Sequence, residues 1–320
     1  MTKSKKPSFL LLGEAIVDLI STDIVGSLED ATNYHRFAGG QVSNLAMNLA
    51  RLGFTAKLGA CVGNDGFGRF LQDRYSAAGV DLDLLQVTSK APTTLIPISR
   101  QTETPDFSVY RGADRFLSSN EQLQTTVDQV QGLHTSAFAL SQDPCRSTIF
   151  NLIKDARDKE LLITLDPNYH PGIWPDIPDY KEFLKVVFQY ISVTKPSIED
   201  SVRFFGPDLK PTNYLEKYLE LGPDIVVLTL GEKGIYLGTQ SGERLHIKAN
   251  QVPVKDVTGA GDAFWSGLLM GLLEGKPPLE AAKLGQVIAE YKIGIIGPVK
   301  QFLTIGDFEK KASQIQVLSI

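Results

Sequence analysis

The sequence DVTGAGD at residues 256–262 runs directly into a helix-prone segment over residues 263–273. A turn of small residues that opens a helix leaves backbone N–H groups unpaired, and these groups can bind phosphate or another anion. A carboxylate at the edge of such a turn suggests a base that deprotonates a hydroxyl as it attacks a phosphoryl group. The same residues also fit an ordinary strand-to-helix turn in which Asp262 caps the helix.

The composition, 42% hydrophobic and 22% charged residues, is that of a globular protein. The length of 320 residues allows one large α/β domain with an elaboration, or two domains. The net charge of −5 is spread along the chain without a basic tract, which argues against a nucleic-acid partner. No stretch approaches the roughly 18 apolar residues that span a membrane, and the apolar run at residues 9–12 is too short for a signal peptide. We therefore expect a cytoplasmic enzyme. Cys61 and Cys145 lie outside any metal-ligand spacing and are expected to be buried.

Short apolar runs that end at Gly, Asp-Pro or Lys-Pro predict parallel strands buried on both faces. They lie at residues 9–12, 161–165, 191–193 and 225–230. Amphipathic stretches such as residues 147–156 separate them and predict helices. Between residues 40 and 53 the apolar positions recur at helical spacing, and Gly53 stands where a C-terminal cap belongs. The pattern predicts an open α/β sheet.

Two segments break this rhythm, because residues 16–37 and 93–111 show alternating or β-branched patterns without a helix between them. We expect them to form a small, mostly antiparallel sheet that covers the main sheet as a lid. The predicted main domain comprises residues 1–12, 41–92 and 115–320. The predicted inserted lid comprises residues 13–40 and 93–114.

Candidate ligand contacts follow the first predicted strand, since ligands in open α/β sheets bind beyond the carboxyl ends of the strands. Asp18 shares a strand face with apolar neighbours, where a carboxylate needs strong partners such as sugar hydroxyls; a solvent-accessible bulge is the alternative. Gly39 and Gly40 open the next predicted helix, with Asn44 in its first turn. Glycines let a ligand approach the backbone and an amide offers a donor and an acceptor, although a plain glycine turn fits too.

Three further segments carry polar residues or glycines near expected strand ends. The glycine-rich residues 63–68 include Asp65, which argues against phosphate contact and favours a structural turn near the sugar pocket. Residues 229–234 can offer backbone N–H groups and a hydroxyl to nucleotide phosphates, or can connect two strands. Residues 197–200 can hold a hydrated Mg²⁺ through their acids, or can form a capping box. The sequence contains neither GxxxxGK[ST] nor GxGxxG, which excludes a Walker-type ATP site and disfavours a dehydrogenase.

The assembled residues resemble the ribokinase-like sugar kinases, also called the PfkB family. That family carries a D-x-x-G-A-G-D motif, found here at residues 256–262, and a G-G-x-x-x-N motif, found here as Gly39, Gly40 and Asn44. The resemblance runs from about residue 13 to residue 299. It implies a three-layer α/β/α fold with a mainly parallel central sheet and a small β-sheet lid.

The resemblance also implies roles for individual residues, with ATP and Mg²⁺ as cofactors. Asp262 resembles the catalytic base, beside an anion hole made by the backbone of Gly259, Ala260 and Gly261. The implied sugar contacts are Asp18, Gly39, Gly40, Asn44 and Asn168. The implied nucleotide contacts are Lys195, Ser197, Thr229, Gly231 and Gly234. By the same resemblance, Asp200 or Glu199 is expected to position Mg²⁺. Asp256 is expected to help bind a monovalent cation, K⁺, with the loop at residues 294–297.

One departure bears on the substrate, because the chain has His170 where relatives acting on fructose or 2-keto-3-deoxygluconate carry arginine in D-P-N-x-R. Histidine lacks the permanent, bidentate charge that pairs with a substrate carboxylate, which favours a neutral hexose over a sugar acid. Arg111, at the end of the predicted lid, can contact either kind of substrate.

We therefore expect ATP-dependent phosphorylation of a primary hydroxyl of a free sugar, fructose first. The alternatives are 2-keto-3-deoxygluconate, ribose or a nucleoside as the acceptor, and a sugar-binding regulator that has lost catalysis. The open edges of the lid strands allow a homodimer through the lid.

Overall fold

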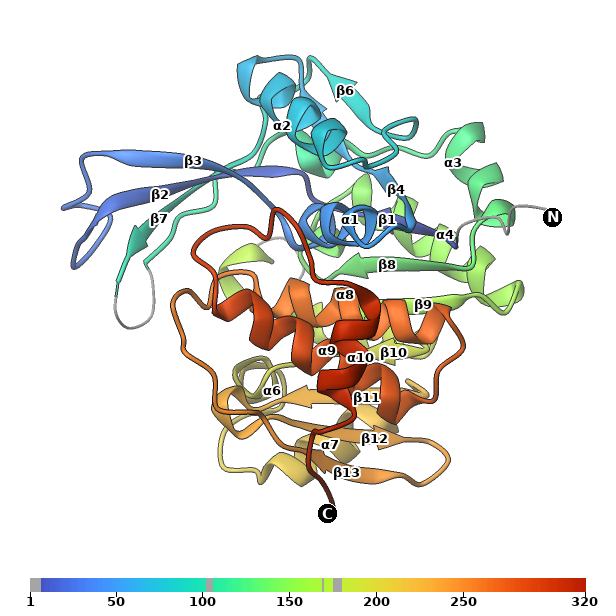
Figure 1. Cartoon of the computed structure of the whole chain (residues 1–320). Coiled ribbons are helices and arrows are strands. Elements are labelled where there is room, and N and C mark those ends of the chain that lie inside the picture. Colours follow the sequence, from blue (N-terminus) through green and yellow to red (C-terminus); the bar gives the residue numbers. More distant parts are fainter. Residues whose placement is uncertain (1–6, 102–105, 169, 175–179) are drawn as a thin grey trace.

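The computed structural model describes residues 7–101, 106–168, 170–174 and 180–320 (Figure 1). In this part of the chain the main sheet has nine strands in the order β14-β13-β12-β11-β10-β9-β8-β1-β4. The strands are β1 Ser8–Leu12, β4 Thr55–Gly59, β8 Gly132–Ser136, β9 Leu162–Asp166, β10 Val193–Thr194, β11 Ile225–Thr229, β12 Ile235–Thr239, β13 Arg244–Ile247 and β14 Val317–Ser319. The strands from β4 to β11 are parallel, and β12 to β14 add an antiparallel edge.

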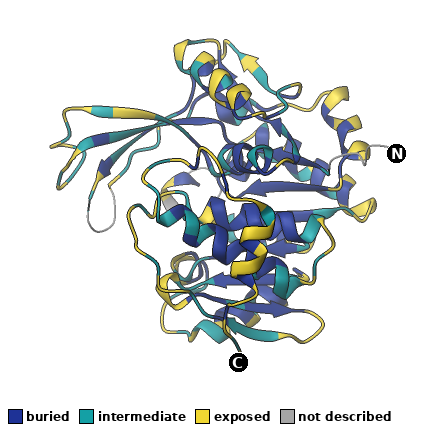
Figure 2. Cartoon of the chain, in the orientation of Figure 1, coloured by how far each residue is buried: buried dark blue, intermediate teal, exposed yellow. Residues whose placement is uncertain are grey.

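Helices cover both faces of this sheet, which gives the three-layer fold that the family resemblance implied (Figures 1 and 2). One face packs in a hydrophobic cluster with α1 Gln41–Arg51, α2 Gly66–Ala77, α8 Ala260–Leu273, α9 Pro278–Ile293 and α10 Ile305–Ala312. The other face packs with α3 Glu121–Thr126, α4 Cys145–Asp158, α5 Tyr180–Phe188, α6 Ile198–Phe205 and α7 Pro211–Glu220. Along β1, Phe9 and Leu11 enter the first cluster and Leu10 and Leu12 enter the second. A strand buried on both faces must be apolar throughout, as the run at residues 9–12 is.

The apolar runs and the helical periodicity predicted the elements that surround β1. Each predicted strand is present, although β10 is reduced to two residues, and α1, α4 and α8 occupy the segments expected to be helical. Gly53 directly follows the C-terminal cap of α1 at Leu52, as its position indicated. Asp65 caps α2 by accepting the Gly68 N–H at 2.7 Å, so residues 63–68 form the structural turn that was predicted.

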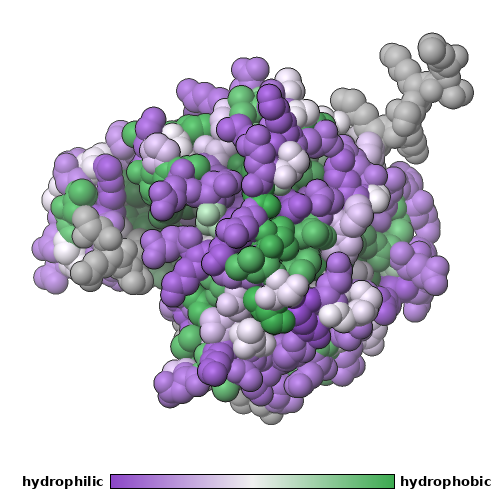
Figure 3. All heavy atoms as spheres, turned by 60° about the horizontal axis from the view of Figure 1, so that its bottom comes forward, coloured by the Kyte–Doolittle hydropathy of each residue, from purple (hydrophilic) through white to green (hydrophobic). Residues whose placement is uncertain are grey.

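The lid is a separate three-stranded sheet in the order β3-β2-β7, and it projects from one side of the body (Figures 1 and 3). Its strands are β2 Ile16–Ile24, β3 Tyr34–Gly39 and β7 Leu95–Arg100. The lid is mostly antiparallel, as predicted, because β2 pairs antiparallel with β3 and β7 forms antiparallel bridges to Phe107 and Tyr110; only β2 and β7 are parallel to each other. The reason is topological, because the chain passes through the main domain before it returns as β7 in the direction of β2. A third, two-stranded parallel sheet joins β5 Cys61–Gly63 to β6 Gln86–Thr88.

Cys61 and Cys145 are buried free thiols, as expected. Among the described residues, no helix combines the length and the apolar character that crossing a membrane requires.

Candidate active site

The site lies at the carboxyl ends of the parallel strands, where the strand order changes direction. β1 pairs with β4 on one side and with β8 on the other, which is the arrangement that opens a ligand crevice in α/β sheets. Glu14 follows β1, Ser136 and Asp166 end β8 and β9, and Lys195 follows β10. The first turns of α1 and α8 approach the same edge, since Gln41 at the start of α1 bonds to Asp166 and Asn44 of α1 bonds to Asp262 of α8.

Asp262 lies in the first turn of α8, directly after a turn whose backbone conformation favours glycine. Gly259 caps this helix in the left-handed conformation with φ 75°, which favours glycine. The Asp262 carboxyl is 8% exposed, and its Oδ2 accepts a hydrogen bond from Asn44 Nδ2 at 3.0 Å. The two motifs that the sequence analysis singled out therefore meet in space.

The protonation of Asp262 is finely balanced. Burial raises its pKa to about 7, and the charge of Asp166 acts in the same direction. The hydrogen bond from Asn44 and the charge of Lys195 oppose this shift. A carboxyl group with a pKa near neutrality is well matched to accept a proton from a hydroxyl during its reaction.

Asp18 in β2 and Gly39 at the end of β3 belong to the lid strands, and with Gly40 they form the end of the site where the lid joins the main domain. The Asp18 carboxyl lies directly against Gly39, where a Cβ would stand 2.1 Å from Asp18 Oδ2. Gly40 caps α1, and its carbonyl accepts the Asn44 backbone N–H at 2.9 Å. Burial, and secondarily the charge of Glu14, raise the pKa of Asp18 to about 7. The geometry brings together the predicted contacts Asp18, Gly39, Gly40 and Asn44.

Glu14 is a central residue to which the sequence analysis gave no role. Its Oε1 accepts the Gln41 N–H at the start of α1 at 2.8 Å, and its Oε2 accepts the Ser136 hydroxyl at 2.6 Å. Burial raises its pKa to about 7, and its charge contributes to the raised pKa values of both Asp18 and Asp262. An acid directly after a fully buried strand was the signal that could have identified it.

Asp166 is a second central residue to which the sequence analysis gave no role, and it bonds to side chains from several elements of the site. Its Oδ2 accepts from Trp265 Nε1 at 2.8 Å and from Gln41 Nε2 at 3.2 Å, and lies 3.6 Å from Lys195 Nζ. It thereby links β9 to α8, α1 and the end of β10. Asn168 follows two residues later as an exposed side chain at the same strand end, and its backbone N–H donates to Asp166 Oδ1 at 3.3 Å.

The predicted nucleotide contacts lie at the neighbouring strand ends. Lys195 Nζ would be 3.6 Å from a Cβ on Gly261, so this ammonium borders the turn at residues 259–261 that is predicted to bind an anion. Ser197 and Thr229 form a parallel bridge, and the Thr229 N–H donates to the Pro196 carbonyl at 2.9 Å. Gly231 begins an exposed 3₁₀ turn, Gly231–Lys233, between β11 and β12. Position 234 requires glycine for a structural reason, because a Cβ there would stand 2.2 Å from the Ile247 carbonyl oxygen.

Asp200 forms the capping box that the sequence allowed as the alternative to a metal role. Its carboxylate accepts from the Ser197 N–H at 3.0 Å and from the Ser197 hydroxyl at 2.8 Å, and its own N–H donates back at 3.0 Å. Burial, and then the charge of Asp166, raise its pKa. In the described part of the chain no three His, Cys, Asp or Glu residues are grouped to hold a metal.

Arg111 and His170 lie at the base of the lid. Arg111 forms a buried ion pair with Asp114 at 2.7 Å, donates to Ser141 Oγ at 2.6 Å and lies 4.2 Å from the Phe138 ring centre. His170 packs edge-on against Phe107 with ring centres 5.0 Å apart. Arg111 is therefore engaged within the protein, and the prediction that it contacts substrate stays a prediction.

Comparison with known proteins decides the family. The model of the pfkB family carbohydrate kinases matches residues 6–300. The chain belongs to this family. The family is that of the sequence resemblance, and the chain is therefore a carbohydrate kinase, a phosphotransferase with a hydroxyl acceptor.

Relatives within the family differ in the acceptor that their names give. An ATP-dependent 6-phosphofructokinase of Thermoanaerobacterium thermosaccharolyticum is 35% identical over 92% of this chain and 90% of its own length. A fructokinase of Klebsiella pneumoniae is 29% identical over 87% of this chain and 89% of its own length. The solved fructokinase of Halothermothrix orenii is 34% identical and superposes with a TM-score of 0.77 over 92% of this chain and 99% of that one.

Asp256, the first acid of the pfkB signature, is held by the chain itself. Its carboxylate accepts from the Thr258 N–H at 3.0 Å and from the Gly297 N–H at 2.9 Å. These bonds join the residues before the turn at 259–261 to the loop at residues 294–297. Binding of K⁺ by Asp256 and this loop stays a prediction.

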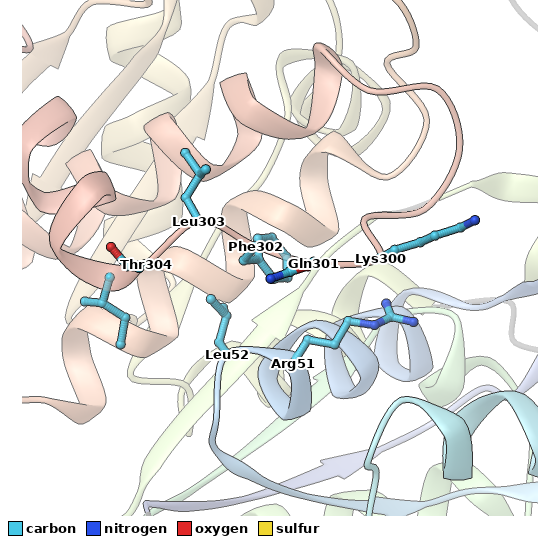
Figure 4. A pocket seen from close by; sticks show the side chains of 8 residues that line it. Arg51, Leu52, Lys300, Gln301, Phe302, Leu303 and Thr304 are labelled. Atoms are coloured by element: carbon cyan, nitrogen blue, oxygen red, sulfur yellow. The ribbon is translucent and has the colours of Figure 1, made fainter.

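A separate pocket of about 350 Å³ lies at the opposite end of α1 (Figure 4). It is lined by Arg51, Leu52 and residues 300–305. Asn44 and Arg51 are seven residues apart on one helix, or about 10 Å along its axis, so this pocket is distinct from the site of Asp262.

Proposed function

We propose that this kinase transfers the γ-phosphoryl group of ATP to a primary hydroxyl of a free sugar, fructose. The observation that carries the proposal is the Asp262 carboxyl, with a pKa near 7, hydrogen-bonded to Asn44 beside the first turn of α8. Its support from relatives is the fructokinase name shared by the Klebsiella pneumoniae protein and the Halothermothrix orenii structure.

In the proposed reaction the sugar lies between Asp18, the backbone at Gly39 and Gly40, and the Asn44 amide. Asp262 accepts the proton of the attacking hydroxyl as its oxygen bonds to phosphorus and the bond from phosphorus to the ADP oxygen breaks. The backbone N–H groups of Gly259 and Gly261 and the Lys195 ammonium stabilise the charge on the transferred group. The Ala260 N–H donates to the Val257 carbonyl at 3.1 Å and would have to leave it to join them. The lid over the sugar excludes water, which would otherwise compete as the acceptor.

The residues present fit a nucleotide phosphate. Lys195 is a buried ammonium at the edge of the anion-binding turn, and Ser197, Thr229 and Gly231 gather at the adjacent strand ends. These residues would hold the outer phosphates of ATP, and bound Mg²⁺ would offset phosphate charge there. Positioning of Mg²⁺ by Asp200 or Glu199 stays a prediction, since the Asp200 carboxylate caps α6.

A phosphorylated sugar competes with the free sugar as the acceptor. Arg111, a cation suited to a charged substituent, is already paired with Asp114, which supports a neutral sugar. The 35% identity to a 6-phosphofructokinase favours instead a sugar that carries a phosphate at its far end. Fructose 6-phosphate is therefore the second candidate acceptor.

A panel of acceptors tests both candidates through the release of ADP. Fructose, fructose 6-phosphate, 2-keto-3-deoxygluconate, ribose and a nucleoside would be compared by kcat/KM at fixed ATP and Mg²⁺. We expect the highest value with fructose. A higher value with fructose 6-phosphate replaces the first candidate by the second, and absence of turnover with every acceptor would refute both.

We also propose that two chains pair through their lids. Strand β3 forms an edge of the lid sheet, and Ile24 at the end of β2 is 62% exposed. An open strand edge with exposed apolar residues is a ready surface for strand pairing. Sedimentation of the protein and of an Ile24→Lys variant tests this, because the variant should shift toward monomer.

A further inference from the structure

A buried lysine lies behind the anion-binding turn of α8. Lys292, in the last turn of α9, is 4% exposed. Its Nζ lies 3.2 Å from the Asp256 carbonyl oxygen, 3.4 Å from the Ile295 carbonyl oxygen and 3.5 Å from Asp256 Oδ2. Burying an ammonium is costly unless it is paired and hydrogen-bonded, and these oxygens supply that compensation.

The oxygens around Lys292 belong to two chain segments, at Asp256 and at Ile295, that are joined by backbone hydrogen bonds. The N–H groups of Lys255 and Asp256 both donate to the Ile293 carbonyl, at 2.8 and 3.2 Å. Burial opposes ionisation of Asp256, but the N–H groups of Gly297 and Thr258, with the charge of Lys292, hold its pKa below its ordinary value. The ammonium therefore joins the approach to the turn at residues 259–261 to the loop that follows α9.

The ammonium occupies the place where the family resemblance led us to expect K⁺. The expected site consisted of Asp256 and the loop at residues 294–297, and Lys292 Nζ contacts oxygens of Asp256 and of Ile295. Carbonyl and carboxylate oxygens bind K⁺ and an ammonium alike, because both are monovalent cations that exchange water for such oxygens. A second cation beside Lys292 would meet a like charge in a setting of low dielectric constant. These residues do not fit an additional K⁺.

We propose that Lys292 is a tethered cation that replaces the monovalent metal and makes this kinase independent of K⁺. The lysine is a positioning residue. A Cβ on Gly259 would stand 3.8 Å from Lys292 Cε, so the lysine stem runs directly behind the residue that opens the anion-binding turn. By fixing Asp256, the ammonium sets the direction of the backbone N–H groups that follow it.

The proposal rests on the proposed ATP-dependent reaction and is tested first on the unaltered protein. Calorimetric ATP binding and turnover would be measured in K⁺, Na⁺, Li⁺ and choline salts at one ionic strength. We expect each quantity to vary by less than about twofold, since no monovalent cation is coupled to the nucleotide. A stimulation by K⁺ of about fivefold or more overturns the proposal. Failure to bind ATP in any salt would instead refute the proposed function.

Two variants separate replacement of K⁺ from a purely structural ion pair. Lys292→Ala removes the charge and leaves room for a cation, whereas Lys292→Met removes the charge and fills the space. Both should weaken ATP binding about tenfold in choline, and K⁺ should restore the alanine variant but not the methionine variant. Lys300→Met is the matched control, because Lys300 is exposed. This variant should bind ATP normally in every salt.

Each outcome decides between the two roles. Normal ATP affinity of Lys292→Ala in choline, or a loss that K⁺ does not restore, overturns the proposal. If Lys292→Ala proves too unstable to measure, the salt series on the unaltered protein and on Lys292→Met still decides it. K⁺ dependence of the unaltered protein alone is sufficient to reject it.

Discussion

Asn44 Nδ2 donates to Asp262 Oδ2 over 3.0 Å and so joins the first turns of two helices that are 218 residues apart in the chain. The contact places a neutral donor on the carboxyl group that the proposed reaction uses as its base. It also stabilises the ionised form of that group, which burial disfavours. The pair therefore controls the pH range in which the site can accept a proton.

Replacing Asp262 by asparagine should lower kcat by roughly 10² to 10⁴, the usual scale for loss of a general base. Fructose binding should change little, because the amide keeps the size of the carboxyl group and can still bond to Asn44. Steady-state turnover and calorimetric sugar binding check both parts. Asp307→Asn, at the exposed start of α10, is the control and should retain full activity. Near-normal turnover of Asp262→Asn would exclude this residue as the base.

The acidic limb of the pH profile should follow the Asp262 carboxyl group. Its pKa of about 7 in the folded protein means that kcat/KM should rise with pH up to about 7 and then level off. Asn44→Ala removes a hydrogen bond that lowers this pKa, so the limb should move to higher pH. The measurement is kcat/KM for the sugar between pH 5.5 and 9, a range of about 3.5 units around that pKa. A limb that stays in place in Asn44→Ala would contradict the assignment.

The fold and half of the site were predictable, because the relevant signals are local. A run of four apolar residues before Gly13 predicts β1, helical spacing predicts α1, and the glycine turn predicts the start of α8. Strand direction is not local. Alternation of residue types marks β7 as a strand and is the same whether its neighbour β2 runs parallel or antiparallel, which is why the sequence did not predict the parallel pairing of β2 with β7.

The missed residues owe their roles to contacts between distant segments. Asp166 acquires its role from Trp265, 99 residues away, and the sequence gives no sign of that contact. Gly234 was assigned to the nucleotide, but the approach of the Ile247 carbonyl is enough to require glycine there. Lys292 did leave a signal, since it lies four residues after the buried Ile288 and thus on the inward face of α9.

Asp18 should make the free protein less stable as the pH rises. Its folded pKa, about 7, lies above the ordinary value of 3.8, so the folded state binds more protons between these two pH values. The stabilisation is complete below about pH 4 and is lost as the pH rises through about 7. Asp18→Asn should remove this contribution, which is at most about 1.4 kcal/mol per pH unit.

Urea unfolding of both proteins at a series of pH values, without sugar, gives the difference in free energy of unfolding. The difference reports Asp18 together with its coupling to Glu14, whereas the contributions of acids distant from Asp18 are common to both proteins. Parallel curves for the two proteins would show that Asp18 titrates in the folded state as it does in the unfolded chain.

A methyl group at Gly39 should damage sugar binding more than it damages the fold. The new Cβ would stand 2.1 Å from Asp18 Oδ2, so the carboxylate must leave its position beside Gly39. We expect Gly39→Ala to raise the KM for fructose at least about tenfold, because a hydrogen-bonded charged contact contributes roughly 1.5–3 kcal/mol. The KM for ATP should change much less, since the nucleotide contacts lie at the ends of β10 and β11. Gly306→Ala is the control, because a Cβ there meets no atom within 4 Å, and it should leave both constants unchanged. Equal losses for sugar and ATP would mean that the substitution disturbs the whole site and that Asp18 has no specific role with the sugar.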